Sequence, residues 1–110
     1  MNTNEFDKGK VFSFNNEVEY AKGSVVSKII LKKESGNVTL FSFDKGQNLS
    51  EHTAPFDAMV HIIDGQAEIL INKESFILNQ GETIIMPAHI PHAVNALKNF
   101  KMVLTMIKSN

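Results

Sequence analysis

The chain has 110 residues, of which 43% are hydrophobic and 21% charged, and its net charge is −1. A chain of this length fits one domain, and the absence of cysteine excludes disulfides, thiolate metal sites and a cysteine nucleophile. The balanced charges give no basic face for nucleic acid, and no stretch approaches the roughly 18 apolar residues of a membrane span. We therefore expect a cytoplasmic protein that binds neither nucleic acid nor membrane.

The first half of the chain predicts an arm followed by a hairpin. Residues 1–23 form the expected N-terminal arm, with an edge strand at Val11–Phe14. Two β-rich segments follow, Ser24–Leu31 and Val38–Phe43, and the turn residues of Glu34–Asn37 lie between them. These two segments should pair as antiparallel neighbours.

The second half predicts further short strands separated by turns. Asp64–Gly65 is a dipeptide typical of two-residue hairpin turns, and it separates two apolar segments. The expected strands are Met59–Ile63, Gln66–Ile71, Ser75–Leu78, Thr83–Met86, His92–Ala96 and Phe100–Ile107. Many short strands without a convincing helix indicate an all-β sandwich or barrel.

Two stretches carry a fixed spacing of glycine and histidine. The first runs from Gly46 to Gly65 with His52 inside it, and the second runs from Gly81 to Ala96 with His92 near its end. In this spacing they resemble the two signature motifs of the cupin family. The resemblance implies that residues 1–110 form a single-domain double-stranded β-helix, the cupin jelly-roll barrel, with a pocket lined by both motifs.

The resemblance also implies a divalent metal such as iron, manganese, nickel or zinc, held by three histidines and a glutamate. Here two of the four ligand positions are filled, by His52 and His92. Ala54 stands in the position of the other first-motif histidine, and Ala58 stands in that of the glutamate. Two histidines alone make a weak metal site, so weak or absent metal binding is expected.

A third ligand would have to come from Asp57 or His89. Asp57 is one residue from the glutamate position and faces the wrong side of a regular strand, so it would need a β-bulge near Pro55. His89 replaces the glycine of the second motif and lies in a proline-bounded turn, where a solvent-exposed histidine is the simpler interpretation.

Strand alternation selects the side chains that share the interior with the two histidines. The resulting pocket combines two imidazoles with apolar walls. Its members are His52, Ala54, Ala58, Val60, His92, Val94, Ala96 and Met102.

The sequence therefore predicts a barrel that binds a small organic ligand around His52 and His92. One alternative is a metal-dependent enzyme of oxygenase or isomerase type, with Asp57 or His89 as third ligand. A second is metal-free acid–base catalysis by the pocket histidines, since imidazole titrates near neutral pH. No catalytic residue can be assigned from the sequence.

A homodimer is also expected. The exposed edges of Val11–Phe14 or Ser24–Leu31 would favour pairing between two copies. On the outer face of the barrel, Met59, His61 and Ile63 would suit the interface.

Overall fold

The computed structural model describes residues 5–109, which form one helical turn and a set of antiparallel strands. The elements are α1 (Phe14–Glu17), β1 (Val25–Lys33), β2 (Gly36–Phe43), β3 (Asn48–His52), β4 (Phe56–Ile71), β5 (Glu74–Asn79), β6 (Thr83–Met86) and β7 (His92–Lys108). The expected all-β fold is confirmed. Within residues 5–109, no helix has the length and apolar character needed to cross a membrane.

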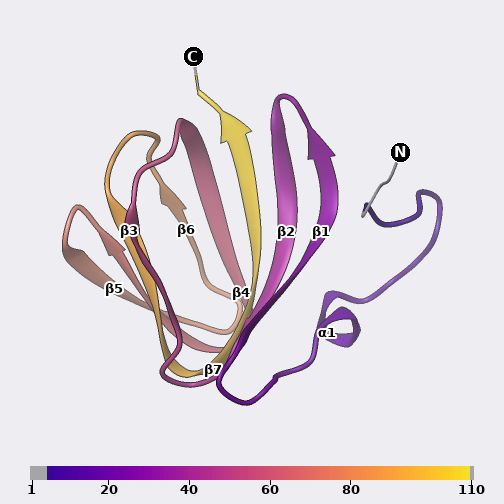
Figure 1. Cartoon of the computed structure of the whole chain (residues 1–110), viewed down its shortest axis with the longest axis horizontal. Helices are drawn as coiled ribbons and strands as arrows, with labels where there is room; N and C mark the ends of the chain where they lie inside the picture. Colours follow the sequence, from indigo (N-terminus) through magenta and orange to yellow (C-terminus); the bar gives the residue numbers. More distant parts are fainter. Residues whose placement is uncertain (1–4, 110) are drawn as a thin grey trace.

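Two long strands, β4 and β7, pair along their whole length and belong to both sheets of the barrel. The first sheet contains β1, β2, the second half of β7, the first half of β4, and β6. The second sheet contains β3, the first half of β7, the second half of β4, and β5. The sheets join where β4 and β7 bend together, and they diverge from that bend (Figure 1). The predicted hairpin is present as β1 and β2.

The predicted turn at Asp64–Gly65 is wrong, because β4 continues through it. The pairing of β4 with β7 shifts register on both sides of Gly65, so the dipeptide forms a bulge that bends the strand. Gly65 has φ +81°, and a β-carbon there would lie 1.8 Å from the carbonyl oxygen of Asn99. Only glycine permits this combination of positive φ and close approach.

The two strands expected at 92–96 and 100–107 are likewise one strand, β7. The exposed residues Leu97, Lys98 and Asn99 resemble a loop in sequence, yet they form the bend opposite Gly65. The Asn99 side chain accepts a hydrogen bond from the backbone N–H of Lys45 at 2.8 Å, which ties the bend to the segment before β3.

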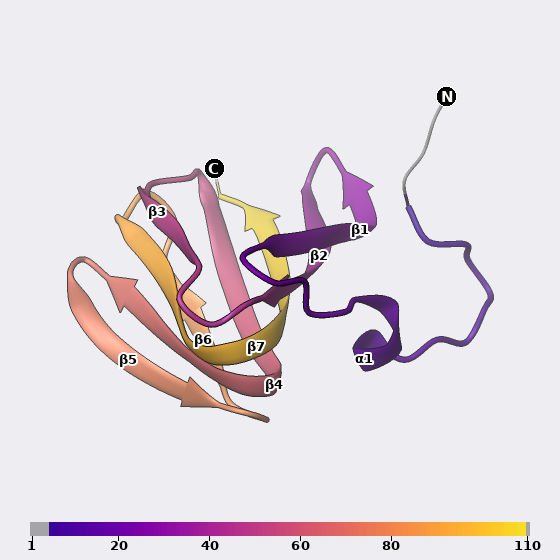
Figure 2. The same cartoon turned by 60° about the horizontal axis from the view of Figure 1, so that its bottom comes forward.

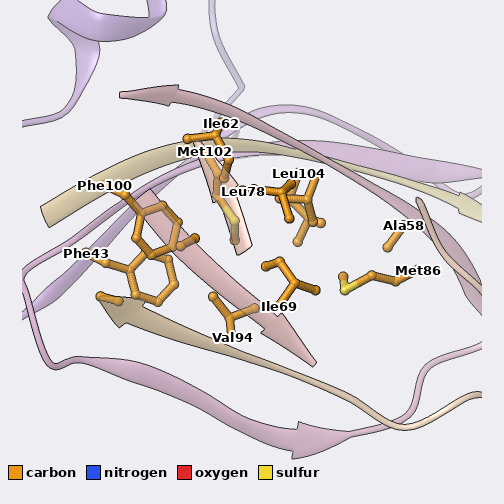
Figure 3. Close-up of a cluster of buried hydrophobic side chains, with 13 residues drawn as sticks. Phe43, Ala58, Ile62, Ile69, Leu78, Met86, Val94, Phe100, Met102 and Leu104 are labelled. Atoms are coloured by element: carbon orange, nitrogen blue, oxygen red, sulfur yellow. The ribbon is translucent and has the colours of Figure 1, made fainter. Parts of the chain in front are cut away.

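The inner faces of both sheets enclose the main core. Val60 and Ile62 point inward before the bulge, and Ala67 and Ile69 do so after it, so the bulge changes which residues are buried. Figure 3 shows Phe43 and Phe100 together at one end of this core and Ala58 and Met86 at the other. The two phenyl rings stack with centroids 4.5 Å apart and fill the end nearest the bend.

The N-terminal arm covers part of the outer face of the first sheet (Figure 2). Val18 packs there against Leu40 and Val103. The arm is also held by a hydrogen bond from the Tyr20 hydroxyl to the Asp64 carboxylate. The expected edge strand at Val11–Phe14 is wrong, because Phe14 instead begins α1. The expected arm was residues 1–23, of which 1–4 lie outside the described residues.

Candidate functional site

His52 and His92 lie opposite each other at the end of the barrel far from the bend. His52 ends β3, and His92 begins β7. The pairing between these strands includes Leu49 with Val94 and His52 with His92, so β3 carries one extra residue between the two pairs. This bulge places both Leu49 and His52 on the side of the buried Val94 and His92. We call this end, where His92 pairs with Ile71 and Phe56 pairs with Lys108, the mouth.

The two imidazoles meet through their Nε2 atoms. These atoms are 3.2 Å apart, and the rings are edge to face with centroids separated by 4.4 Å. On the other side of each ring, Nδ1 lies near a backbone carbonyl oxygen. The distances are 2.7 Å from His52 to Ser50 and 3.2 Å from His92 to Ile90.

The carbonyl contacts favour one tautomer for each ring. A carbonyl oxygen only accepts hydrogen bonds, so each neutral ring carries its hydrogen on Nδ1 and a lone pair on Nε2. Two neutral rings in this tautomer therefore direct lone pairs at each other, and neither Nε2 donates a hydrogen bond to the other. The two Nε2 atoms attract each other only through a third partner, which can be a shared proton, a hydrogen-bond donor from a ligand, or a metal ion.

The two histidines differ in their surroundings. His52 is exposed, whereas His92 is only 6% exposed. Burial lowers the pKa of His92, and the positive charge of a protonated His52 lowers it further, while the hydrogen bond to Ile90 opposes the shift. The neutral form of His92 is thus favoured, with its Nε2 available as an acceptor.

The predicted apolar walls lie on the inner face of the barrel. Ala58, Val60, Val94, Ala96 and Met102 are all buried, and Ala54 is half-buried between β3 and β4. Val60 and Met102 are fully buried, so no water-sized space touches them. The assignment of these residues to a ligand pocket stays a prediction. Among the predicted pocket residues, only His52 and Ala54 at the mouth are more than slightly exposed to solvent.

The structure does not bring either expected third ligand to the histidine pair. Asp57 is exposed on β4 whereas its neighbour Ala58 is buried, so the Asp57 side chain faces outward. The Asp57 carboxylate instead accepts a hydrogen bond from the backbone N–H of Ala88 at 2.9 Å. His89 is exposed in a turn. Among residues 5–109, no three histidine or acidic side chains are grouped closely enough to hold a metal ion.

The segment before His92 has a backbone conformation that sequence reasoning missed. His89 has φ +68°, a left-handed conformation that glycine adopts far more readily. Its backbone N–H donates to the carbonyl oxygen of Ala54 at 2.8 Å, which ties the segment to the end of β3. The signal was present in the motif, because His89 occupies the position where the motif has glycine.

Comparison with known proteins agrees with this architecture. A family model for the cupin domain matches residues 39–108. The chain belongs to the cupin family. This cupin is similar to a conserved Streptococcus pyogenes protein of unknown function, with TM-score 0.91 and 38% identity, covering 97% of this chain and 94% of that one. No curated protein matches it.

Two further solved cupins are similar. A cupin 2 conserved barrel domain protein from Leptotrichia buccalis has TM-score 0.86 and 41% identity over 88% of this chain. This cupin spans only 47% of the Leptotrichia protein. A cupin superfamily protein from Desulfitobacterium hafniense has TM-score 0.85 and 23% identity, covers 97% of each chain, and supports the fold alone.

Proposed function

We propose that this cupin binds a small organic molecule at the mouth of the barrel, through a hydrogen-bond-donating group placed between His52 and His92. The observation that carries the proposal is the convergence of two Nε2 acceptors at 3.2 Å while both Nδ1 atoms face carbonyl oxygens. Acceptors held this close without a donor are costly, and a ligand donor removes that cost.

The geometry favours a hydroxyl or amino group as the bound end. An amino group can donate one hydrogen to each Nε2 at ordinary distances of about 2.8–3.0 Å, whereas a single hydroxyl has one hydrogen, which it donates to one Nε2 or shares between the two. A carboxylate or ketone oxygen has no hydrogen to donate to a neutral pair. The expected ligands are therefore polyols, sugars or amines rather than simple carboxylates or ketones.

Apolar side chains beside the pair suit the rest of such a ligand. Leu49 precedes His52 on β3, and Ile71 pairs directly with His92 on β4. Both are half-buried and pack against the main core. A small binding site with a few convergent polar atoms and apolar flanks is the usual composition of a ligand site.

The divalent metal of the family does not fit the residues found here. A tetrahedral site with one open position takes three protein ligands, and within residues 5–109 no third histidine or acidic side chain is grouped with the two imidazoles. Ala54 and Ala58 hold the other two family positions and have no ligating atom. The two histidines themselves therefore bind the ligand, without a metal ion between them.

The test is a thermal-shift screen at about pH 8, which lies above the reference imidazole pKa of about 6.5. The panel contains sugars, polyols and amines, with matched carboxylates and ketones of similar size. Ligands of the first group are expected to raise the melting temperature in proportion to their saturation of the site.

Three variants assign any shift to the site. His52→Ala should abolish it without unfolding the chain, because His52 is exposed. His92→Ala should abolish it as well, although its burial makes folding a necessary check. His61→Ala is the control, since His61 lies on the outer face and hydrogen-bonds Thr83. A shift that survives both mouth variants would contradict the proposal.

A further inference from the structure

Strand β5 is the last strand of the second sheet and has a free edge. It pairs with β4 on one side only, and in Figure 2 it runs along the lower left margin of the molecule. The two strands are joined by a two-residue turn, Asn72–Lys73, in which both residues have positive φ. In a hairpin with such a turn, the residues on either side of it exchange backbone hydrogen bonds, and exchanging pairs then alternate with non-exchanging ones.

This alternation leaves the backbone N–H and C=O groups of Ser75 and Ile77 on the free edge. Glu74 follows the turn directly, so it and every second residue after it bond to β4, and the residues between them direct their groups away. Asn79 agrees with this direction, because its N–H donates to the Glu82 carboxylate at 2.7 Å instead of to β4. No other strand within residues 5–109 pairs with β5 there.

The free edge of β1, in contrast, is protected. The N–H of Phe6 donates to the carbonyl oxygen of Ile30 at 3.0 Å, and the carboxylate of Glu5 accepts from the N–H of Lys32. Strand β1 also carries three lysines, and charged side chains of this kind discourage strand pairing. From residue 74 to residue 86 the sequence has no lysine, arginine or proline. The β5 edge therefore lacks the protection that the β1 edge has.

A groove of about 550 Å³ lies beside the β5 edge, between β5 and β6. Its apolar wall is formed by Phe76 and Leu78 from β5 and by Ile84 from β6, and all three belong to the main core. Phe76 and Ile84 are only half-buried, so they offer apolar area to a side chain that enters from the edge. Glu82 and Thr83 add polar atoms to the same groove. Its size is that of an ordinary ligand site.

The groove has an acidic rim, formed by Glu74 and Glu82. Glu74 begins β5, Glu82 follows its end, and both are exposed. The lysine that precedes β5, Lys73, forms an ion pair with Glu51 at 3.3 Å. The rim therefore favours an occupant that brings positive charge of its own.

We propose that the β5 edge binds an extended, cationic peptide segment of a partner protein, which adds a strand to the second sheet. The backbone of the segment forms hydrogen bonds with Ser75 and Ile77. Alternate side chains of an extended chain point to opposite sides, so one set enters the groove against Phe76 and Ile84 and the other remains in solvent. Apolar residues suit the groove, and lysine or arginine suits the acidic rim.

The test measures binding of a fluorescent, capped seven-residue peptide in which valine alternates with lysine. Two further peptides carry N-methyl groups, one on all the valines and the other on all the lysines. An added strand directs only every second amide at the edge, so one of the two methylated peptides should bind at least about tenfold more weakly and the other should bind like the parent.

Two variants locate the binding. Ile77→Pro removes a donor from the free edge and none from the pairing with β4, so it should weaken binding about tenfold. Ile77→Thr is the matched control, because it keeps the N–H and a β-branched side chain. Glu82→Gln should weaken binding about two- to fivefold, as expected for loss of an exposed ion pair. Circular dichroism checks that each variant is folded, and the methylated peptides decide alone if Ile77→Pro is not.

Discrimination between the two methylated peptides, with weaker binding to Ile77→Pro than to Ile77→Thr, supports the proposal. Failure of the wild type to bind the parent peptide at about 1 mM overturns it. Equal affinities for the two methylated peptides also overturn it, because side chains alone would then carry the binding. An affinity that falls as the protein concentration rises would assign the edge to a second copy of the chain and would overturn the proposal as well.

Discussion

The bend and the mouth of this barrel are built from the same two strands but are determined by different interactions. At the bend, Gly65 and Asn99 approach through backbone atoms, and the rings of Phe43 and Phe100 stack beneath them. At the mouth, the Nε2 atoms of His52 and His92 face each other, and His89, three residues before His92, has a left-handed backbone conformation. One end is filled by stacked aromatic rings, whereas at the other two histidine nitrogens face each other.

This difference suggests that substitutions at the bend change mainly folding stability, whereas those at the mouth change mainly binding. The bend is formed by a close backbone approach and a stacked aromatic pair in the core, so changes there should affect folding. The mouth keeps arrangements that cost free energy, which persist in proteins mainly at functional sites. Substitutions at the two ends should therefore differ in both the size and the kind of their effects.

The largest effect is expected from Gly65→Ala. The new β-carbon would lie 1.8 Å from the Asn99 carbonyl oxygen, and the residue would keep a positive φ. The clash and the backbone strain together should lower the free energy of unfolding by more than about 3 kcal/mol. Chemical denaturation measures this loss.

Gly81→Ala separates the two causes. Gly81 also has a positive φ, but a β-carbon there would meet nothing within 4 Å. Gly81→Ala should therefore lower the free energy of unfolding by about 1–2 kcal/mol, because of the strained backbone conformation alone. Equal losses at both glycines would show that the close approach at the bend does not limit stability.

The bend also shows how far the sequence determines the fold. Alternating apolar residues and the motif spacing were enough to predict an all-β barrel and the inward face of most strands. They did not distinguish a bulge from a hairpin at Asp64–Gly65, because both need a residue with positive φ. The choice depends on the close approach of Asn99, which is 34 positions away and invisible in local sequence.

A second test restores the missing ligands at the mouth. In Ala54→His/Ala58→Glu, four side chains would occupy the positions that hold metal in the family. Elemental analysis should then give near-stoichiometric divalent metal, against little or none in the wild type. Because Ala58 is buried, the glutamate should destabilise the chain by a few kcal/mol in chelator and much less with metal.

Ala54→His/Ala58→Gln is the control for this variant, since it keeps the shape of the side chains and removes the carboxylate. It should bind metal more weakly than the glutamate variant. Stoichiometric metal in the wild-type chain would instead show that two imidazoles are sufficient and would favour the metal-dependent alternative.

The pH dependence of stability should depend on His92. Its pKa is lowered in the folded chain, so the unfolded chain binds the proton more tightly. The stabilising contribution is therefore complete above the ordinary histidine pKa of about 6.5 and is lost as the pH falls towards the folded value. Melting temperatures between about pH 7.5 and pH 5.5 should fall more steeply for the wild type than for His92→Gln. The control is His61→Gln, which removes a histidine from the outer face and leaves the His52–His92 contact in place.

The mouth shows the limit of sequence reasoning about the site. The spacing of the motifs identified His52 and His92 as partners, and their Nε2 atoms are 3.2 Å apart. It could not show that Ser50 and Ile90 orient both rings through backbone carbonyls, since any residue type supplies a carbonyl. It also left Asp57 open as a ligand, because a bulge is a property of the strand pairing and not of the residues alone.

The smallest expected effect is a gain in stability from His89→Gly. His89 holds φ +68° in the segment that leads to His92, and glycine adopts this conformation without the steric cost of a β-carbon. The free energy of unfolding should rise by about 1 kcal/mol. His89→Ala removes the same imidazole but keeps the β-carbon, so it should give no gain. If both variants were equally stabilised, the imidazole itself would be the source of strain. A gain confined to glycine would show that the mouth retains backbone strain that the bend, with Gly65 in place, avoids.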